Sequence, residues 1–418
     1  MREMKDSGVA WIGEIPKEWN LIRYKDKYKN SKEIAGDKSS SYERLALTLN
    51  GVIKRPKDDS DGLQPKEFDT YQVLHENDFV FKMIDLQNIS TSRVGLSPYT
   101  GLVSPAYIRF RPKSEKQYPR FIYYFLMSMY YNCVFNHLGG DGVRSALNGS
   151  DMGMLLIPYP IESEQRRIAD YLDTVCGKVD ALIANQQTQI EKLKAYKQSL
   201  ITEVVTRGLN PDAPMKDSGV EWIGMIPQGW EIIRGKFALK LMSRPTMSTD
   251  DVITCFRDGE VTLRKNRREE GFTFSDKEIG YQGIEPGDLV IHGMDGFAGA
   301  IGISDSRGKG SPVLIVCDSK NNKKYLAYYL RNLAYRNIFV ALATGIRVRS
   351  CDLRWNKLSV LPFVLPPISE QQQIADYLDT KCAKIDTLIA IKQQKIEKLT
   401  EYKKSLIYEY VTGKKEVV

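Results

Sequence analysis

Few residues of this 418-residue chain have the types and spacing that catalysis needs. The sequence contains no G-x-x-x-x-G-K-[ST] phosphate loop, no H-E-x-x-H zinc motif, no G-x-S-x-G nucleophile elbow and no N-P-P-[YF] segment of the amino-methyltransferase kind. The histidines lie in three separate places without metal-ligand spacing to a cysteine: His75, His137 and His292. We therefore predict no catalytic residue, no metal site and no cofactor, and expect a protein that binds rather than catalyses.

Residues suited to binding a polyanion are more frequent. Lys and Arg total 60 against 52 Asp and Glu, which gives a net charge of +8 and favours anionic partners. Several of these cations lie in basic loops, where the planar guanidinium of arginine suits both a phosphate and the edge of guanine. An ordinary solvated surface is the alternative for any single one of them. The candidates for contact with nucleic acid are Lys54, Arg55, Lys57, Arg93, Arg144, Arg264, Lys265, Arg267, Arg268, Arg347 and Arg349.

The cysteine usage and the lack of long apolar runs indicate a location. Six cysteines are scattered without a C-x-x-C pair, which is typical of free thiols in a reducing cytoplasm. The chain lacks the apolar core of a signal peptide, and no uninterrupted apolar run approaches the roughly 18–20 residues needed to cross a bilayer. The sequence predicts a cytoplasmic protein that does not bind a membrane.

Two segments, one at the start of the chain and one past its middle, are almost identical: MKDSGVAWIGEIPKEW (4–19) and MKDSGVEWIGMIPQGW (215–230). Each places Asp and Ser beside a glycine, which could mark an active site. We favour a large apolar anchor with a proline-fixed turn, because each copy leads into a dissimilar block. The anchor residues are Trp11, Ile12, Ile15 and Trp19, with counterparts Trp222, Ile223, Ile226 and Trp230.

A second, longer pair shows that the whole chain is duplicated. Residues 163–206 and 369–412 are identical at 29 of 44 positions, and their offset is close to that of the first pair. Between the repeats, residues 24–157 and 235–361 share little. This order predicts a constant frame with one function and two variable blocks with different functions. It also places the end of the second long repeat near the N-terminus.

Each long repeat predicts one helix of about 43 residues, because its apolar residues recur at steps of three, four and seven. A helix of that length with an apolar seam needs a partner, and the other copy supplies one. Antiparallel pairing gives a pseudo-two-fold molecule with one block at each end, whereas parallel pairing sets the blocks side by side. We predict an antiparallel coiled coil that is imperfect near Gln186, Gln189 and Lys392.

The two variable blocks are expected to share one α/β fold with different surfaces, so that the chain as a whole is α+β. Each block mixes short strand-like segments with one helix rich in tyrosine or phenylalanine. These aromatic residues could stack on bases, but we favour packing in the core. The strand-like segments are 78–84, 106–112, 287–294 and 311–317, and the aromatic helices are 118–135 and 322–340.

The motifs MKDSGVxWIGxIPxxW and PxxSEQxxIADYLDxxxxKxD, in their two-copy order, resemble the specificity (S) subunit of type I restriction-modification enzymes. The resemblance covers essentially the whole chain. It implies two target recognition domains, residues 1–157 and 211–364, and two repeated helical spacers, residues 158–210 and 365–418.

The resemblance further implies that each target recognition domain reads one half of a bipartite, asymmetric site in double-stranded DNA. The helices would set the spacing and dock two methyltransferase (modification) subunits, which recruit restriction (translocase and endonuclease) subunits. The chemistry of S-adenosylmethionine, ATP and Mg²⁺ would belong to those partners and none to this chain. Two alternatives stay open: a coiled-coil adaptor with two protein-binding end domains, and a self-sufficient nuclease or methyltransferase with an unrecognised site.

Overall fold

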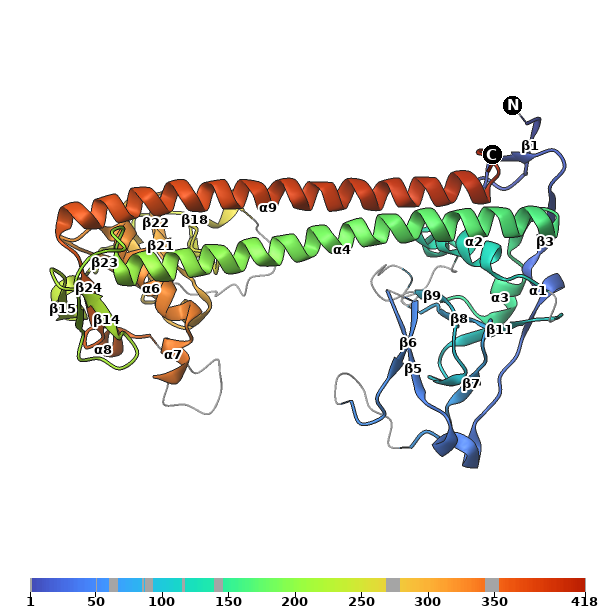
Figure 1. Ribbon diagram of the computed structural model, residues 1–418, viewed down its shortest axis with the longest axis horizontal. Helices are drawn as coiled ribbons and strands as arrows, with labels where there is room; N and C mark the ends of the chain where they lie inside the picture. Colours follow the sequence, from blue (N-terminus) through green and yellow to red (C-terminus); the bar gives the residue numbers. More distant parts are fainter. Residues whose placement is uncertain are drawn as a thin grey trace. The chain divides into compact units, whose positions relative to one another are not determined.

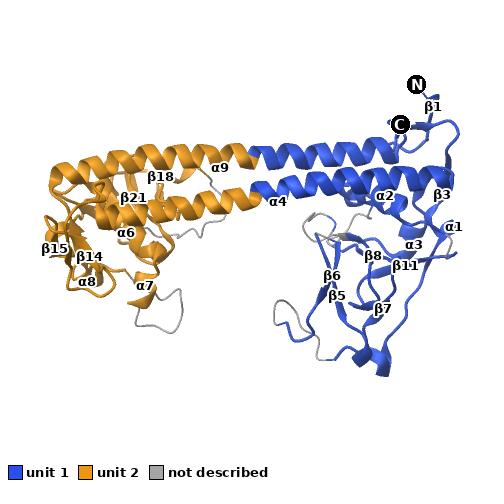
Figure 2. Cartoon of the chain, in the orientation of Figure 1, with its two compact units in different colours: residues 1–186, 394–418 blue, residues 187–393 orange. Residues whose placement is uncertain are grey.

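The computed structural model describes residues 2–49, 51–59, 67–84, 86, 93–114, 117–138, 146–267, 279–342 and 353–417. The chain forms two compact units (Figure 2). Unit 1 contains residues 1–186 and 394–418, and unit 2 contains residues 187–393. Each unit thus combines one copy of the short repeat, one variable block and one segment of each long helix.

Two four-stranded sheets form the variable block of unit 1 (Figure 1). One sheet has the strand order β6-β5-β10-β7 and the other has the order β4-β11-β8-β9. The elements in chain order are β1 (Met4–Asp6), β2 (Glu14–Pro16), β3 (Asn20–Arg23), α1 (Tyr24–Lys27), β4 (Tyr28–Asn30), η1 (Gly36–Ser41), β5 (Arg44–Thr48), β6 (Gly51–Arg55), β7 (Gln72–Leu74), β8 (Phe79–Lys82), β9 (Arg93–Leu96), β10 (Gly101–Val103), β11 (Ile108–Pro112), α2 (Arg120–Tyr131), η2 (Val134–His137), α3 (Gly149–Gly153), β12 (Leu156–Tyr159) and α4 (Glu162–Arg207).

The variable block of unit 2 repeats this topology although its sequence differs. The sheet β16-β23-β20-β21 corresponds to β4-β11-β8-β9, and the remaining strands pair as β17-β18 and β19-β22. The elements are β13 (Met215–Asp217), β14 (Met225–Pro227), β15 (Glu231–Arg234), α5 (Gly235–Ala238), β16 (Lys240–Leu241), β17 (Ile253–Cys255), β18 (Val261–Leu263), η3 (Arg264–Asn266), β19 (Gln282–Ile284), β20 (Leu289–His292), η4 (Gly296–Ala298), β21 (Ile301–Ile303), β22 (Gly308–Gly310), β23 (Leu314–Asp318), α6 (Lys323–Tyr335), α7 (Ile338–Ala341), α8 (Trp355–Leu358), β24 (Pro362–Leu365) and α9 (Ile368–Val411).

The predicted elements of both blocks are confirmed, although they are shorter than the patterns that predicted them. The four strand-like segments contain β8, β11, β20 and β23, and the aromatic helices are α2 and α6. The aromatic side chains pack in the cores, as favoured over base stacking: Phe121 and Phe125 are buried in unit 1, and Tyr325 and Tyr329 are buried in unit 2.

Both long helices form as predicted, with 46 residues in α4 and 44 in α9. Within unit 1 their segments run antiparallel. Lys403 Nζ lies 2.6 Å from Asp180 Oδ1, and the rings of Tyr410 and Tyr171 are 4.7 Å apart, so residues later in α9 contact residues earlier in α4. Unit 2 repeats this arrangement: Lys197 lies 2.6 Å from Asp386, and Lys392 donates a hydrogen bond to Gln189. The antiparallel direction is confirmed within each unit, and coiled-coil geometry stays a prediction.

The short repeat acts as an apolar anchor in both units. Ile12, Ile15 and Trp19 are buried in one core with the end of α9. Gly413 adopts a positive φ of 71° after that helix, and a Cβ there would clash with the ring of Pro16. Only glycine fits this helix end without strain. The end of the second long helix therefore lies beside the first short repeat, as predicted.

The Asp-Ser pair of the short repeat stabilises a turn. Asp6 Oδ1 accepts a hydrogen bond from the backbone N–H of Gly8 at 2.9 Å, and Ser7 Oγ accepts one from that of Val9 at 3.2 Å. The second copy makes the same two bonds at 3.0 and 3.1 Å. Side chains of this kind commonly close turns on their own backbone. These contacts support the anchor interpretation over an active site.

Candidate nucleic-acid interface

The basic candidates of the two halves lie on equivalent hairpins. In unit 1, β5 and β6 pair antiparallel, and Arg44 in β5 lies opposite Leu102 of β10 in a parallel register. In unit 2, β17 and β18 pair antiparallel, and Val252 beside β17 lies opposite Lys309 of β22, again in parallel. The topology therefore brings the first cluster of basic candidates and part of the second to the same place in the fold.

In unit 1 the hairpin forms a pocket that contains three of the candidates. Lys54 Nζ lies 2.6 Å from Glu43 Oε2 and 5.2 Å from the ring centre of Tyr99. Its hydrogen bond to Glu43 raises the pKa of Lys54, which therefore keeps its charge. The pocket is lined by Tyr42, Glu43, Arg44, Lys54, Arg55, Pro56 and Lys57.

The other two candidates in this pocket, Arg55 and Lys57, are also held in place. Arg55 Nε donates a hydrogen bond to Asp59 Oδ2 at 2.6 Å, and Lys57 Nζ donates one to the carbonyl oxygen of Ser39 at 2.9 Å. Lys57 also lies 5.6 Å from the ring centre of Phe68. A cation that is oriented by carbonyl and ring contacts can present its charge to a phosphate with a smaller loss of side-chain entropy.

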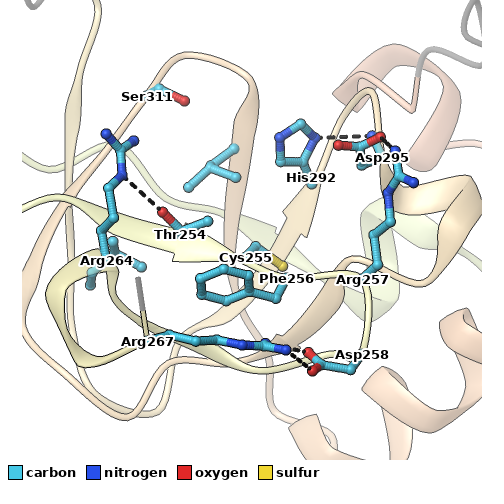
Figure 3. A pocket seen from close by; sticks show the side chains of 12 residues that line it. Thr254, Cys255, Phe256, Arg257, Asp258, Arg264, Arg267, His292, Asp295 and Ser311 are labelled. Atoms are coloured by element: carbon cyan, nitrogen blue, oxygen red, sulfur yellow. Dashed lines mark hydrogen bonds and ion pairs between the residues drawn. The ribbon is translucent and has the colours of Figure 1, made fainter. Parts of the chain in front are cut away.

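In unit 2 the hairpin forms a larger pocket of about 730 Å³ (Figure 3). Arg257 lies 2.9 Å from Asp295 in its lining, and Arg264 Nε donates a hydrogen bond to Thr254 Oγ1 at 3.4 Å. The pocket is lined by Ile253, Thr254, Cys255, Phe256, Arg257, Asp258, Arg264, Arg267, His292, Asp295, Ser311 and Leu314.

Two of the predicted cations are occupied by intramolecular ion pairs. Arg267 lies 2.5 Å from Asp258 and 3.1 Å from Glu260, and its guanidinium covers the ring of Phe256 at 4.2 Å. The bond to Asp258 raises the pKa of Arg267. Lys265 forms an ion pair with Asp251. Acidic side chains thus orient Arg267 and Lys265 as they orient Lys54 and Arg55 in unit 1, and contact with DNA stays a prediction for each of these cations.

Five candidates cannot be placed as side chains. Arg93 begins β9, and only its backbone is described. The remaining four lie outside the described residues: Arg144, Arg268, Arg347 and Arg349. Their contact with nucleic acid stays a prediction.

The sequence pattern missed His292, which ends β20 and lines the pocket of unit 2. Its ring Nδ1 accepts hydrogen bonds from the backbone N–H groups of Asp295 at 3.0 Å and Met294 at 3.3 Å. Burial lowers the pKa of His292, and Arg257 lowers it further, whereas Asp295 opposes the shift. The sequence GMDG (293–296) after β20 could have indicated this role, because a turn there brings backbone N–H groups back to the imidazole.

A second feature shared by both blocks is a buried aspartate. Asp78 accepts a hydrogen bond from Arg109 Nε at 2.6 Å, and both side chains are almost fully buried. Asp288 lies at the equivalent position and forms an ion pair with Arg244. Each aspartate also caps the turn before its strand by accepting a backbone N–H at 2.8 Å. These pairs fix the turns that lead into β8 and β20.

Neither a metal centre nor a membrane span emerges from the part of the chain that the structure describes. No group of three or more His, Cys, Asp or Glu residues could hold a metal ion among those residues. In the same residues, no helix is long and apolar enough to cross a membrane.

Comparison with known proteins decides the family. A model of the type I restriction modification DNA specificity domain matches residues 22–192 and 282–401, which is more than half of the chain. The chain belongs to the type I restriction-modification DNA specificity family. Its function is therefore that of a specificity subunit. The match covers β5, β6 and most of the block in unit 1, and in unit 2 it covers β20 with His292.

Relatives of similar length support this assignment. The type I restriction enzyme MjaVIII specificity subunit of Methanocaldococcus jannaschii is 23% identical over 421 residues, covering 96% of this chain and 93% of that protein. A protein of the same organism, provisionally named the type I restriction enzyme MjaX specificity subunit, is 23% identical over 438 residues, covering 96% and 95%.

A solved structure supports the fold. This chain is similar to a chain from a structure described as the structural basis of complex assembly and conformational transition of the type I R-M system, with a TM-score of 0.65 and 15% sequence identity. The similarity covers 95% of this chain and 98% of that one. At this identity the likeness supports the fold alone.

Proposed function

We propose that the chain reads a bipartite, asymmetric site in double-stranded DNA, with one target recognition domain on each half. Residues 1–157 and 211–364 form these two domains, and residues 158–210 and 365–418 form the helical spacers. The spacers dock two methyltransferase subunits, through which restriction subunits join the complex. The chain itself is not a catalyst, and it acts in the cytoplasm.

The observation that carries this proposal is the equivalent basic hairpin in two blocks of dissimilar sequence. The long repeat of the frame is identical at 29 of 44 positions, whereas the hairpins keep their topology and change their side chains. On these hairpins unit 1 presents Arg55, with Lys54 and Lys57 beside it, and unit 2 presents Arg264. Two blocks that share one topology but present different polar groups are suited to reading two different base sequences.

The test is methylation mapping in cells that express this chain with its modification subunit. We expect methylation at a motif with two specified parts and an unspecified spacer. Cells with either protein alone should show no such methylation, and the purified chain with S-adenosylmethionine should not transfer a methyl group. Transfer by the chain alone would support the self-sufficient enzyme. A complex of the two proteins that does not bind DNA would support the protein-binding adaptor.

A further inference from the structure

We propose that His292 determines specificity in the second half-site by donating its Nε2–H to an acceptor on a guanine edge. This inference rests on the proposed function, since it names the group that the pocket of unit 2 reads. The geometry of three features leads to it: the ring orientation, the polar groups around the ring and the position of His292 in the repeated fold.

The hydrogen bonds of the ring fix its tautomer. Because Nδ1 accepts from the N–H groups of Asp295 and Met294, it carries no proton, and the proton of the neutral ring lies on Nε2. Figure 3 shows Nε2 on the opposite side of the ring from Asp295, facing the part of the pocket lined by Thr254 and Ser311. His292 thus offers one directed donor to the pocket.

The ring is neutral near pH 7, which separates its role from that of a phosphate contact. Burial lowers the pKa of His292, and Arg257 adds to this effect, while Asp295 acts in the opposite sense. Phosphate contacts come mainly from cations and do not depend on sequence. A neutral, oriented donor gains little from a phosphate charge and is suited to a base edge.

The surroundings favour guanine over the other bases. Guanine presents two acceptors, N7 and O6, in the major groove, whereas adenine and cytosine also present an amino donor there and thymine a methyl group. The acids that line the pocket, Asp258 and Asp295, are engaged by Arg267 and Arg257. Thr254, Ser311 and His292 supply hydroxyl and N–H donors, and Arg264 adds a guanidinium. A pocket of donors complements an edge of acceptors.

The equivalent residue in unit 1 differs. Asp78 and Asp288 lie in equivalent turns of the two units. Aligning β8 with β20 from these turns places Lys82 at the position of His292. A duplicated fold that carries a lysine in one copy and an oriented neutral histidine in the other has diversified this position. Such divergence is expected where the two copies read different bases and not where they contact the shared DNA backbone.

Two nearly isosteric substitutions separate reading from folding. His292→Asn places an amide oxygen where Nδ1 lies, so the turn keeps its acceptor, while the shorter side chain has no donor at the position of Nε2. His292→Gln places an amide nitrogen where Nε2 lies, so the donor is kept while the turn loses its acceptor. Each variant is expressed with the modification subunit, and the fraction of each motif variant that is methylated is measured genome-wide. His137→Gln in unit 1 is the matched histidine control.

We expect His292→Asn to relax one position of one half-site, lowering the preference for guanine about 10-fold or more. His292→Gln should retain the preference at a lower overall methylation level, and His137→Gln should leave the motif unchanged. A His292→Asn motif identical to that of the wild type, at normal methylation, overturns the role of His292. So does a wild-type motif without guanine in the half read by unit 2. Absence of a bipartite motif in the wild type overturns the proposed function instead.

Discussion

The indole Nε1 of Trp19 lies 3.0 Å from Oε2 of Glu164 and donates a hydrogen bond to it. Trp19 ends the first short repeat, and Glu164 lies in the first turn of α4, 145 positions away along the chain. Trp230 and Glu370 repeat this bond at 3.1 Å in unit 2. The short repeat is therefore tied to the start of the long helix that follows the variable block, so each block begins and ends at one anchor.

We expect Trp19→Phe to destabilise the protein by about 1–3 kcal/mol. Phenylalanine keeps most of the apolar area, but the nearly buried carboxylate of Glu164 loses a hydrogen-bond donor. Denaturant unfolding followed by circular dichroism measures the change. Trp11→Phe is the control, because Trp11 packs against Phe125 at 5.5 Å, and no hydrogen bond of its indole is found among the described residues. Equal losses in both variants would contradict the account.

We expect Asp173→Asn to loosen the aromatic helix α2 from α4 in unit 1. Asp173 accepts hydrogen bonds from Arg120 Nε at 2.8 Å and from the hydroxyl of Tyr124 at 2.6 Å. The pair is about one-third exposed, so the loss should be about 1–2 kcal/mol, measured by denaturant unfolding. Asp379→Asn is the equivalent change in unit 2. Its partner Lys324 is more exposed, so a smaller loss is expected there. A larger loss for Asp379→Asn would contradict this ranking.

The repeats made most of the frame predictable, whereas the positions of the charged groups required the fold. The three- and four-residue steps through Ile168 and Leu172 predicted α4 because a seam must be buried. Arg267 is one of the predicted contacts with nucleic acid, yet it forms ion pairs with Asp258 and Glu260, which lie 9 and 7 positions before it. The β17–β18 hairpin brings these acids to it. Sequence periodicity does not report such contacts.

We expect stability to fall between about pH 9 and pH 12, in part because of Cys255. Burial raises the pKa of this thiol from its ordinary value of 9.0 to about 12. Above pH 9 the unfolded chain loses the proton while the folded chain keeps it, so the unfolded state gains stability as the pH rises. The slope per thiol is about 1.4 kcal/mol per pH unit. Urea unfolding of the wild type and of Cys255→Ala measures it.

The variant should lose stability less steeply with pH than the wild type, whatever its stability at pH 8. Equal slopes for the two proteins would show that Cys255 ionises equally in the folded and unfolded chains.

We expect Lys54→Ala and Lys57→Ala to weaken DNA binding uniformly across sequences. Each lysine that neutralises a phosphate contributes about 0.9 to the slope of log affinity against log salt concentration. Binding of the complex to its own site and to unrelated DNA is measured over a range of salt concentrations. Lys320→Ala, an exposed lysine of unit 2, is the control and should leave the slope unchanged. A loss confined to the specific site would instead indicate that these lysines read bases.

We expect matched insertions of one helical turn in α4 and α9 to lengthen the unread spacer. Gln189 and Lys392 are in contact, so four residues inserted after each keep the pairing on both sides. Four residues add about 6 Å, which is close to two base pairs. Methylation mapping should show both half-sites unchanged and a longer spacer. The original spacing, with normal methylation, would argue against the helices as the spacer.

Methylation mapping of two hairpin variants tests most directly whether each unit reads its own half-site. Arg55 is replaced by alanine in unit 1, and Arg264 is replaced by alanine in unit 2. The wild type should methylate a bipartite motif, the first variant should lose or relax one half only, and the second variant should relax the other half only. A continuous motif, or two variants that relax the same half, would contradict the account.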